Sequence, residues 1–100
     1  MTYAIHPQAE DELTQAAVFY AEHASKAIAA AFLDEFDRVV DKLIKNQQCG
    51  PHCEGGLRVY HFDRFPYTVI YEVSDALGPQ IFAVAHQRRE PGYWRDRVCA

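Results

Sequence analysis

The spacing of the apolar residues changes once along this chain, and the change falls in the segment Gln47–Gly56. Before this segment, apolar residues recur at the three- and four-residue intervals of a helix that is buried on one side. After it, they alternate with polar residues, as on a β-strand with one buried face. Helices followed by strands, rather than helices and strands in alternation, favour an α+β fold.

The helical part divides into two segments. Proline suits the first turn of a helix, and acidic residues, here Glu10, Asp11 and Glu12, stabilise the positive end of the helix dipole. We therefore expect a first helix from Pro7 to Glu22. Ser25 is a suitable N-cap for a second helix that extends to Asn46. The buried stripe of the first helix is mostly alanine, which predicts a very close neighbour.

The second helix has a broad apolar stripe and a charged opposite side. Only a short loop separates it from the first helix, so the two are expected to form an antiparallel hairpin whose charged side lies in water. The apolar stripe consists of Phe32, Leu33, Phe36, Val39, Val40, Leu43 and Ile44. The residues expected in water are Asp34, Glu35, Asp37, Arg38, Asp41 and Lys42.

Four short segments have the pattern of strands: 2–5, 57–62, 67–73 and 80–85. Short turns join the last three into an antiparallel meander, to which the N-terminal strand adds an edge. We therefore expect one domain, residues 1–100, of order β-α-α-β-β-β, with the helical hairpin on one face of a small antiparallel sheet. The other face is available to a partner. Arg58, Tyr60 and Phe62 share one side of their strand, opposite to Leu57 and Val59.

The net charge of −4 argues against a protein that coats nucleic acid without specificity, because such binding depends on summed positive charge. Residues 1–50 carry four basic against eight acidic side chains, whereas residues 51–100 carry six of each, and all six basic ones are arginines. The longest apolar run, Ala27–Leu33, is too short to span a bilayer, and the N-terminus does not resemble an export signal. These features predict a cytoplasmic protein without a membrane segment.

The three cysteines, Cys49, Cys53 and Cys99, are expected to be free thiols, because their number is odd and no export signal precedes them. Cys49, His52 and Cys53 lie close together in the sequence. Their spacing is not that of a zinc finger, and no second pair of ligands is evident. We therefore expect neither a metal site nor a cofactor.

The last predicted strand runs directly into a segment rich in arginine and aromatic residues, FAVAHQRREPGYWRDR. Loops that leave a strand end are where a rigid scaffold usually presents working residues. The candidates for contact with a target are His86, Arg88 or Arg89, and Tyr93. Trp94 is expected to be structural, as a hydrophobic plug that the Pro91-Gly92 turn brings back onto the sheet.

In order along the chain stand HPQAEDEL, AVFY, AAFLDEFDRVV, GGLRVYHFDRFPYTVIYEV and IFAVAHQRREPGYW. The order and spacing of these segments resemble the ParE/RelE superfamily of bacterial toxins, and the likeness covers nearly the whole chain. The RFPYTVIYEV segment and the strand ending in AVAH are closer to the ParE side.

This resemblance implies a small cytoplasmic toxin that a cognate antitoxin neutralises by wrapping it with an extended, partly disordered segment. Antitoxins of this kind usually bind operator DNA, so the toxin would reach that DNA only indirectly. ParE-like members poison DNA gyrase, which is the favoured function. The first alternative is the RelE-like one, cleavage of ribosome-bound messenger RNA. The second is a weakly toxic or inactive relative that acts as a plasmid-stabilisation or co-repressor partner.

The resemblance also implies roles for individual residues. RelE-like enzymes use lysines, arginines and a tyrosine, but no lysine follows Lys45 here, so a histidine would have to move the proton. This departure favours a non-catalytic gyrase inhibitor. The catalytic residues of a ribonuclease would be Arg58, His86, Arg89 and Tyr93. The residues expected to contact a target are Arg58, Tyr60, Arg88, Arg89, Tyr93 and Arg95.

Overall fold

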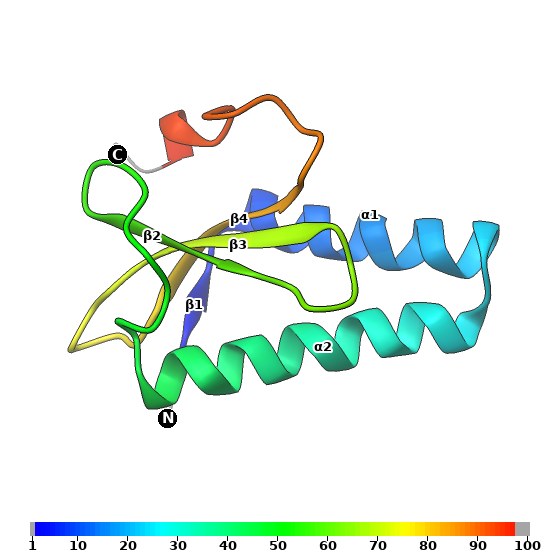
Figure 1. Ribbon diagram of the computed structural model, residues 1–100, viewed down its shortest axis with the longest axis horizontal. Coiled ribbons are helices and arrows are strands. Elements are labelled where there is room, and N and C mark those ends of the chain that lie inside the picture. The colour runs from blue at the N-terminus through cyan, green and yellow to red at the C-terminus, as the bar shows by residue number, and fades with distance from the viewer. Residues whose placement is uncertain (1, 98–100) are drawn as a thin grey trace.

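A computed structural model describes residues 2–97 (Figure 1). Two helices, α1 and α2, lie between the first and second strands of a four-stranded sheet, so the predicted order β-α-α-β-β-β is confirmed. The elements are β1 (Ala4–Ile5), α1 (Pro7–His23), α2 (Lys26–Lys45), β2 (Leu57–His61), β3 (Tyr67–Glu72), β4 (Gln80–His86) and the short 3-10 helix η1 (Arg95–Arg97). Neither α1 nor α2 is long and apolar enough to cross a membrane.

The sheet has the strand order β1-β4-β3-β2. β2, β3 and β4 form the predicted antiparallel meander, in which Tyr67 at the start of β3 pairs with His86 at the end of β4. β1 lies at the edge, as predicted, but it runs parallel to β4, so the sheet is mixed. β1 pairs with β4 over only a few residues. The last backbone hydrogen bond, from the His6 amide just after β1 to the Ile81 carbonyl, is 2.8 Å long. The second half of β4 is therefore left to other partners.

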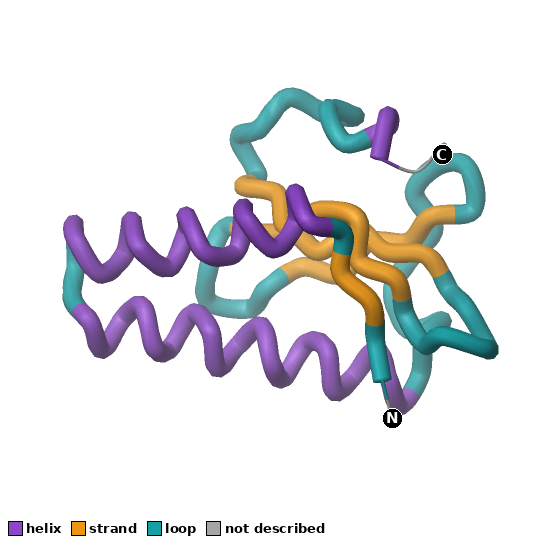
Figure 2. The backbone as a smooth tube through the Cα atoms, turned by 180° about the vertical axis from the view of Figure 1, so that it is seen from behind, coloured by secondary structure: helices purple, strands orange, loops and turns teal. Residues whose placement is uncertain are grey.

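The two helices form the predicted antiparallel hairpin, seen side by side in Figure 2. The Ser25 hydroxyl accepts a hydrogen bond from the Ile28 amide at 3.1 Å, which confirms Ser25 as the N-cap of α2. At the start of α1, the His6 ring caps the helix instead, because its Nδ1 accepts from the Gln8 amide at 3.1 Å.

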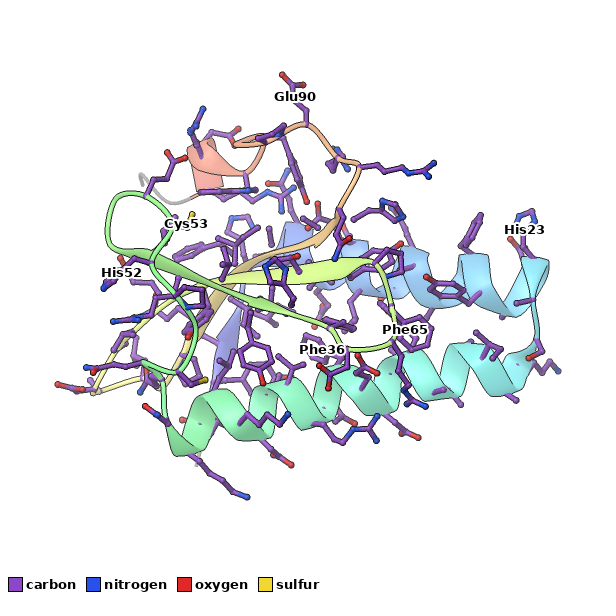
Figure 3. The ribbon with its side chains drawn as sticks, in the orientation of Figure 1. His23, Phe36, His52, Cys53, Phe65 and Glu90 are labelled. Atoms are coloured by element: carbon purple, nitrogen blue, oxygen red, sulfur yellow. The ribbon has the colours of Figure 1, made fainter. Side chains whose placement is uncertain are left out.

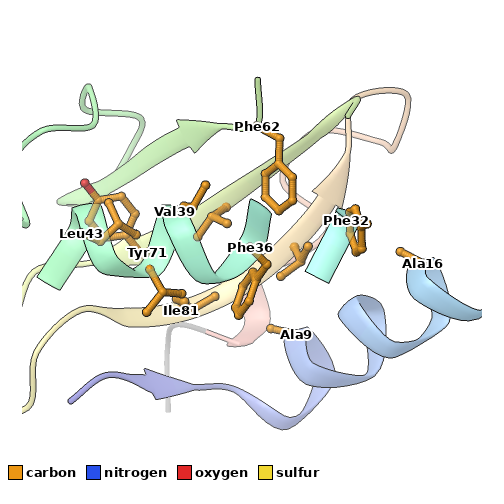
Figure 4. Close-up of a cluster of buried hydrophobic side chains, with 12 residues drawn as sticks. Ala9, Ala16, Phe32, Phe36, Val39, Leu43, Phe62, Tyr71 and Ile81 are labelled. Carbon is orange, nitrogen blue, oxygen red and sulfur yellow. The ribbon is translucent and has the colours of Figure 1, made fainter. Parts of the chain in front are cut away.

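The main core lies between the hairpin and one face of the sheet (Figure 4). We call this side of the sheet the helix face. Phe32 and Leu43 of α2 are fully buried against strand residues such as Tyr71 and Ile81. Ala9 of α1 is also fully buried, which agrees with the close packing that its small stripe predicts.

One prediction about α2 is wrong. Glu35 was expected in water, but it is only 3% exposed, and its carboxylate accepts hydrogen bonds from the backbone amides of Asp63 and Arg64 at 2.6 and 3.0 Å and from Arg64 Nε at 3.0 Å. It thereby holds the turn between β2 and β3. Leu33, which was expected to widen the apolar stripe, is instead 39% exposed. The partners of Glu35 lie almost thirty positions away, so helical periodicity alone could not reveal them.

Candidate functional site

The chain that follows β4 crosses the face of the sheet opposite the helix face, as Figure 1 shows above the strands. We call residues 87–97 the C-terminal strap and the sheet surface beneath it the strap face. Trp94 of the strap is 6% exposed and packs on Leu57, Ile70 and Ala83 of three different strands. Its predicted role as a hydrophobic plug is confirmed.

A turn at Gly92 directs Trp94 toward the sheet. The φ angle of Gly92 is 80°, a backbone conformation that favours glycine, and Arg95 donates a backbone hydrogen bond to the Gly92 carbonyl at 3.1 Å. A Cβ at this position would also meet the Arg95 guanidinium at 2.5 Å. Glu90 lies at the outer bend of the strap and points away from the sheet (Figure 3).

Glu12 of α1 fastens the strap. Its carboxylate accepts hydrogen bonds from the Tyr93 hydroxyl at 2.6 Å and from both terminal nitrogens of Arg97 at 2.9 and 3.1 Å. It also accepts from the Val84 amide at 3.1 Å, while Arg97 donates to the Phe82 carbonyl at 3.1 Å. The Glu12–Arg97 pair therefore satisfies the edge of β4 beyond the end of β1, where an unpaired strand edge would be costly.

This fastening alters the acid–base properties of the strap. Burial and the hydrogen bond to Glu12 raise the pKa of the Tyr93 hydroxyl well above its usual range. For Arg97, burial alone would disfavour the charge, but the hydrogen bonds and negative charge of Glu12 outweigh it, so the pKa of Arg97 is raised. Tyr93 is thus a neutral hydrogen-bond donor, and Arg97 is a permanent cation.

A cavity of about 210 Å³ lies between α1, the end of β4 and the strap. Three of the predicted site residues meet there. His86 packs edge-on against Tyr67 with ring centroids 5.1 Å apart, and its Nδ1 accepts from the Arg88 amide at 3.0 Å. The Arg89 guanidinium stacks on the Tyr93 ring at 4.0 Å from its centroid. The residues that line the cavity include Gln15, Phe19, Tyr67, His86, Arg89 and Tyr93.

Two other predicted site residues lie elsewhere. Arg58 pairs with Tyr71, and Tyr60 packs in the core cluster beside α2, so both are on the helix face. Arg58 donates to the carbonyls of Gln48 and Gly50 at 3.1 and 2.7 Å, and thus holds the loop before β2. Lys42 lies 5.7 Å from the centre of the Tyr60 ring.

Two predicted residues remain. Arg95 forms a two-pronged ion pair with Glu54 in the loop before β2, with both hydrogen bonds at 2.8 Å. Arg88 contributes its amide to His86 and has an exposed side chain. The structure therefore divides the predicted set: His86, Arg88, Arg89 and Tyr93 gather at the end of β4, whereas Arg58, Tyr60 and Arg95 do not join them.

Comparisons with known proteins identify the family. A sequence model described as the ParE toxin of the type II toxin–antitoxin system parDE matches residues 3–91. This chain belongs to that family of ParE toxins. The resemblance to the ParE/RelE superfamily is thereby confirmed. A solved chain from the "Chromosomal ParDE TA system from P. aeruginosa" shares the fold, with a TM-score of 0.73, 20% sequence identity, and coverage of 86% of this chain and 95% of that one. No curated protein matches.

Sequence reasoning missed the two residues that organise the site of this ParE-family toxin. Glu12 was interpreted only as an acidic residue near the start of the first helix, and Arg97 only as one of the arginines that follow the last strand. In the structure their side chains are 14% and 8% exposed and face each other. A lone acidic residue on the alanine-rich side of α1 was the available signal, since a charge on a buried stripe requires a partner.

The loop before β2 carries the cysteine–histidine motif. Cys49 and Cys53 are exposed free thiols, as predicted, while Cys99 lies outside the described residues. His52 Nε2 lies 3.0 Å from the Arg58 guanidinium, and Figure 3 shows His52 and Cys53 on this loop. Within residues 2–97, no three acidic, histidine or cysteine side chains are arranged to hold a metal ion.

Proposed function

We propose that this chain inhibits growth by poisoning DNA gyrase, that it does so without cutting RNA, and that a cognate antitoxin neutralises it. The observation that carries the proposal is the separation of Arg58 from the other three predicted catalytic residues, His86, Arg89 and Tyr93, which line one cavity. Cleavage of RNA through its 2′-hydroxyl requires a base, a phosphate-binding cation and an acid around one phosphodiester.

The position of Arg58 argues against such an arrangement. Arg58 pairs with Tyr71 and His86 pairs with Tyr67, so four residues of β3, about 13 Å, separate their positions along the sheet. They are also on different strands, with β3 between β2 and β4. The Arg58 guanidinium is already hydrogen-bonded to the Gly50 carbonyl. It is therefore suited to holding a loop and poorly placed to bind a phosphate beside His86.

The state of Tyr93 supports the same conclusion. Its hydroxyl donates to Glu12, and its pKa is raised by burial and by that carboxylate, so releasing its proton is unfavourable. A group that transfers protons near neutral pH usually has a pKa close to 7. Tyr93 is thus better suited to supporting Arg89 by stacking than to acid–base catalysis.

The antitoxin part of the proposal is supported by the printed description of the similar solved chain as part of a ParDE system. The helical hairpin also exposes large apolar side chains that an extended partner segment would cover: Val18, Phe19, Ile28 and Leu33. Contact with operator DNA would then run through the antitoxin. Gyrase as the target places the site of action in the cytoplasm.

The test is induction of the chain alone and together with the adjacent antitoxin gene, followed by supercoiling assays with purified gyrase. We expect arrested growth, rescue by the antitoxin, and inhibited supercoiling with accumulation of cleaved DNA. Arg89→Ala should reduce the inhibition of gyrase, whereas Arg58→Ala, which removes the same charge at a position away from the cavity, should retain it if the protein remains folded. Normal growth in both cases would exclude a toxin, and rapid fragmentation of translated messages with intact supercoiling would overturn the gyrase proposal.

A further inference from the structure

The cavity beside Arg89 contains hydrogen-bond donors whose own partners are few. Its one carboxylate, Glu12, already accepts four hydrogen bonds, from Val84, Tyr93 and twice from Arg97. Both carboxylate oxygens are therefore occupied. The negative charge of Glu12 is balanced by the positive charge of Arg97, whose nearest nitrogen lies 2.9 Å from a Glu12 oxygen. Glu12 leaves little capacity to pair with other cations in the cavity.

His86 presents a donor as a consequence of its backbone contact. Because its Nδ1 accepts from the Arg88 amide, a neutral ring must carry its proton on Nε2, an assignment that follows from the hydrogen bond. The Nε2 edge of His86 is therefore suited to an acceptor on a ligand.

Arg89 contributes a positive charge with its N–H edge available. Its guanidinium carbon lies 4.0 Å from the centre of the Tyr93 ring, a cation–π contact that does not use its N–H groups as hydrogen-bond donors. Within residues 2–97, neither Arg88 nor Arg89 forms a salt bridge. Gln15 adds an amide on the α1 side of the cavity.

The outer rim of the cavity is aromatic. Phe19 is 53% exposed, and its ring centroid lies 4.6 Å from that of His23. The ring of Tyr67 also lines the cavity. Exposed aromatic rings beside a guanidinium are typical of surfaces that bind single-stranded nucleic acid, because bases stack on the rings while phosphates bind the cation.

We propose that this cavity binds a phosphodiester of a single nucleic-acid strand, with the phosphate on Arg89 and His86 and a neighbouring base against Phe19. A net charge of −4 excludes extensive coating of nucleic acid but not one local contact. The inference goes beyond the proposed function, since inhibition of gyrase does not require the toxin to contact DNA. It is tested with the purified chain alone, so its failure would leave the gyrase proposal standing.

The experiment is an NMR titration of the ¹⁵N-labelled full chain with a short oligothymidylate. We expect the largest shifts at the amides of Gln15, His86 and Arg89, and a dependence of log K on log salt with a slope of about −0.7 for each phosphate contacted. Arg89→Gln should weaken binding by about tenfold or more. Lys45→Gln, the same charge change at the end of α2 away from the cavity, should leave affinity close to that of the unchanged chain.

Parallel titrations with an oligoribouridylate, inorganic phosphate and an oligoglutamate peptide identify the ligand. Binding of either oligonucleotide at the cavity supports the proposal, and the tighter of the two identifies the strand as DNA or RNA. Tighter binding of oligoglutamate than of either strand would overturn it in favour of an acidic protein partner. Binding of inorganic phosphate alone would overturn it in favour of a small anion. Phe19→Ala provides a second check, because it should weaken binding of the strand but not of phosphate.

Discussion

The two faces of the sheet are covered by different means. On the helix face, two long helices pack large apolar side chains such as Phe32, Phe36 and Leu43 into one continuous cluster. On the strap face, the strap contributes one large buried side chain, Trp94, and is held at its edges by polar contacts. The helix face therefore contains most of the burial that stabilises the fold, whereas the cover of the strap face depends on a few named interactions.

Two glutamates of the helical hairpin, one on each helix, are also largely buried, and their comparison shows what such a residue does. Glu35 joins α2 to the turn between β2 and β3, while Glu12 joins α1 to residues at the far end of the chain. Arg38 of the same helix lies 3.8 Å from Glu35, but the side-chain hydrogen bonds of both carboxylates within residues 2–97 come from other segments. Each satisfies backbone amides that no strand pairs with, at Arg64 and at Val84 respectively. Arg89 and Tyr93, the centre of the candidate site, are positioned by the second of these contacts.

The largest expected effect is the loss of stability when a side chain buried on the helix face is removed, compared with the loss when an exposed one is removed. Phe32→Ala removes a ring that is fully buried at the centre of the cluster, so we expect the free energy of unfolding to fall by about 3–5 kcal/mol. Urea unfolding followed by far-ultraviolet circular dichroism measures it. The matched control is Phe19→Ala, since that ring is 53% exposed and the same atoms are removed. Equal losses in the two variants would contradict the assignment of the core.

Much of this architecture was predictable because it follows from local patterns. Helical spacing of apolar residues and the N-cap at Ser25 predicted the helices. The alternation of apolar and polar residues predicted the strands to within one or two residues of their observed ends. Glu35 and Glu12 were misinterpreted for one reason: their partners lie 28 and more residues away, and no local pattern encodes that distance. The parallel pairing of β1 is a similar case, since β1 has only two residues.

The candidate site was predictable only in part, and β2 shows why. The alternation along β2 correctly separates Arg58 and Tyr60 from Leu57 and Val59. Both sides of this strand carry apolar residues, however, so the pattern could not indicate which side meets the helices. The residues that follow β4 were easier to place, because the end of one strand and its short continuation remain together in any meander.

The second prediction tests whether the strap is a separate unit. Trp94 is the single tryptophan, so intrinsic fluorescence reports the strap directly, while circular dichroism reports the helices. Glu12→Gln leaves Arg97 charged in a largely buried place, at a cost of about 2–3 kcal/mol that detachment of the strap relieves. We expect the fluorescence transition in urea to move well below the dichroism transition.

Tyr93→Phe is the graded control for this experiment, because it removes one hydrogen bond to Glu12 and retains the ion pair with Arg97. Its fluorescence transition should lie between those of the unchanged chain and Glu12→Gln. If the two transitions coincide in all three proteins, the strap unfolds with the helix face and the proposed independence of the two faces is wrong.

The third prediction uses pH to probe Glu35. Burial alone would raise its pKa, but hydrogen bonds from the Arg64 amide and side chain and the Asp63 amide outweigh burial, so the pKa of Glu35 lies below its ordinary value of 4.5. A lowered pKa in the folded state stabilises the protein above that ordinary value, and this stability is lost as the pH falls below it. The free energy of unfolding of the unchanged chain should therefore decline with acidification more steeply than that of Glu35→Gln. Asp37→Asn, an exposed site on the same helix, should keep the steep decline.

The smallest expected effect concerns the second attachment of the strap. Arg95 and Glu54 form an ion pair of good geometry, but their side chains are 62% and 50% exposed, and water and salt weaken such pairs. Arg97, at 8% exposed, pairs with Glu12 where water has little access. We therefore expect Arg95→Gln to leave the urea midpoint of the Trp94 fluorescence transition within experimental error of the unchanged chain. Arg97→Gln, the same change two residues away, should lower this midpoint as Glu12→Gln does. Release of the strap by Arg95→Gln at moderate salt would instead locate its main attachment on the loop before β2, and Arg89 and Tyr93 would then be positioned from that side rather than from α1.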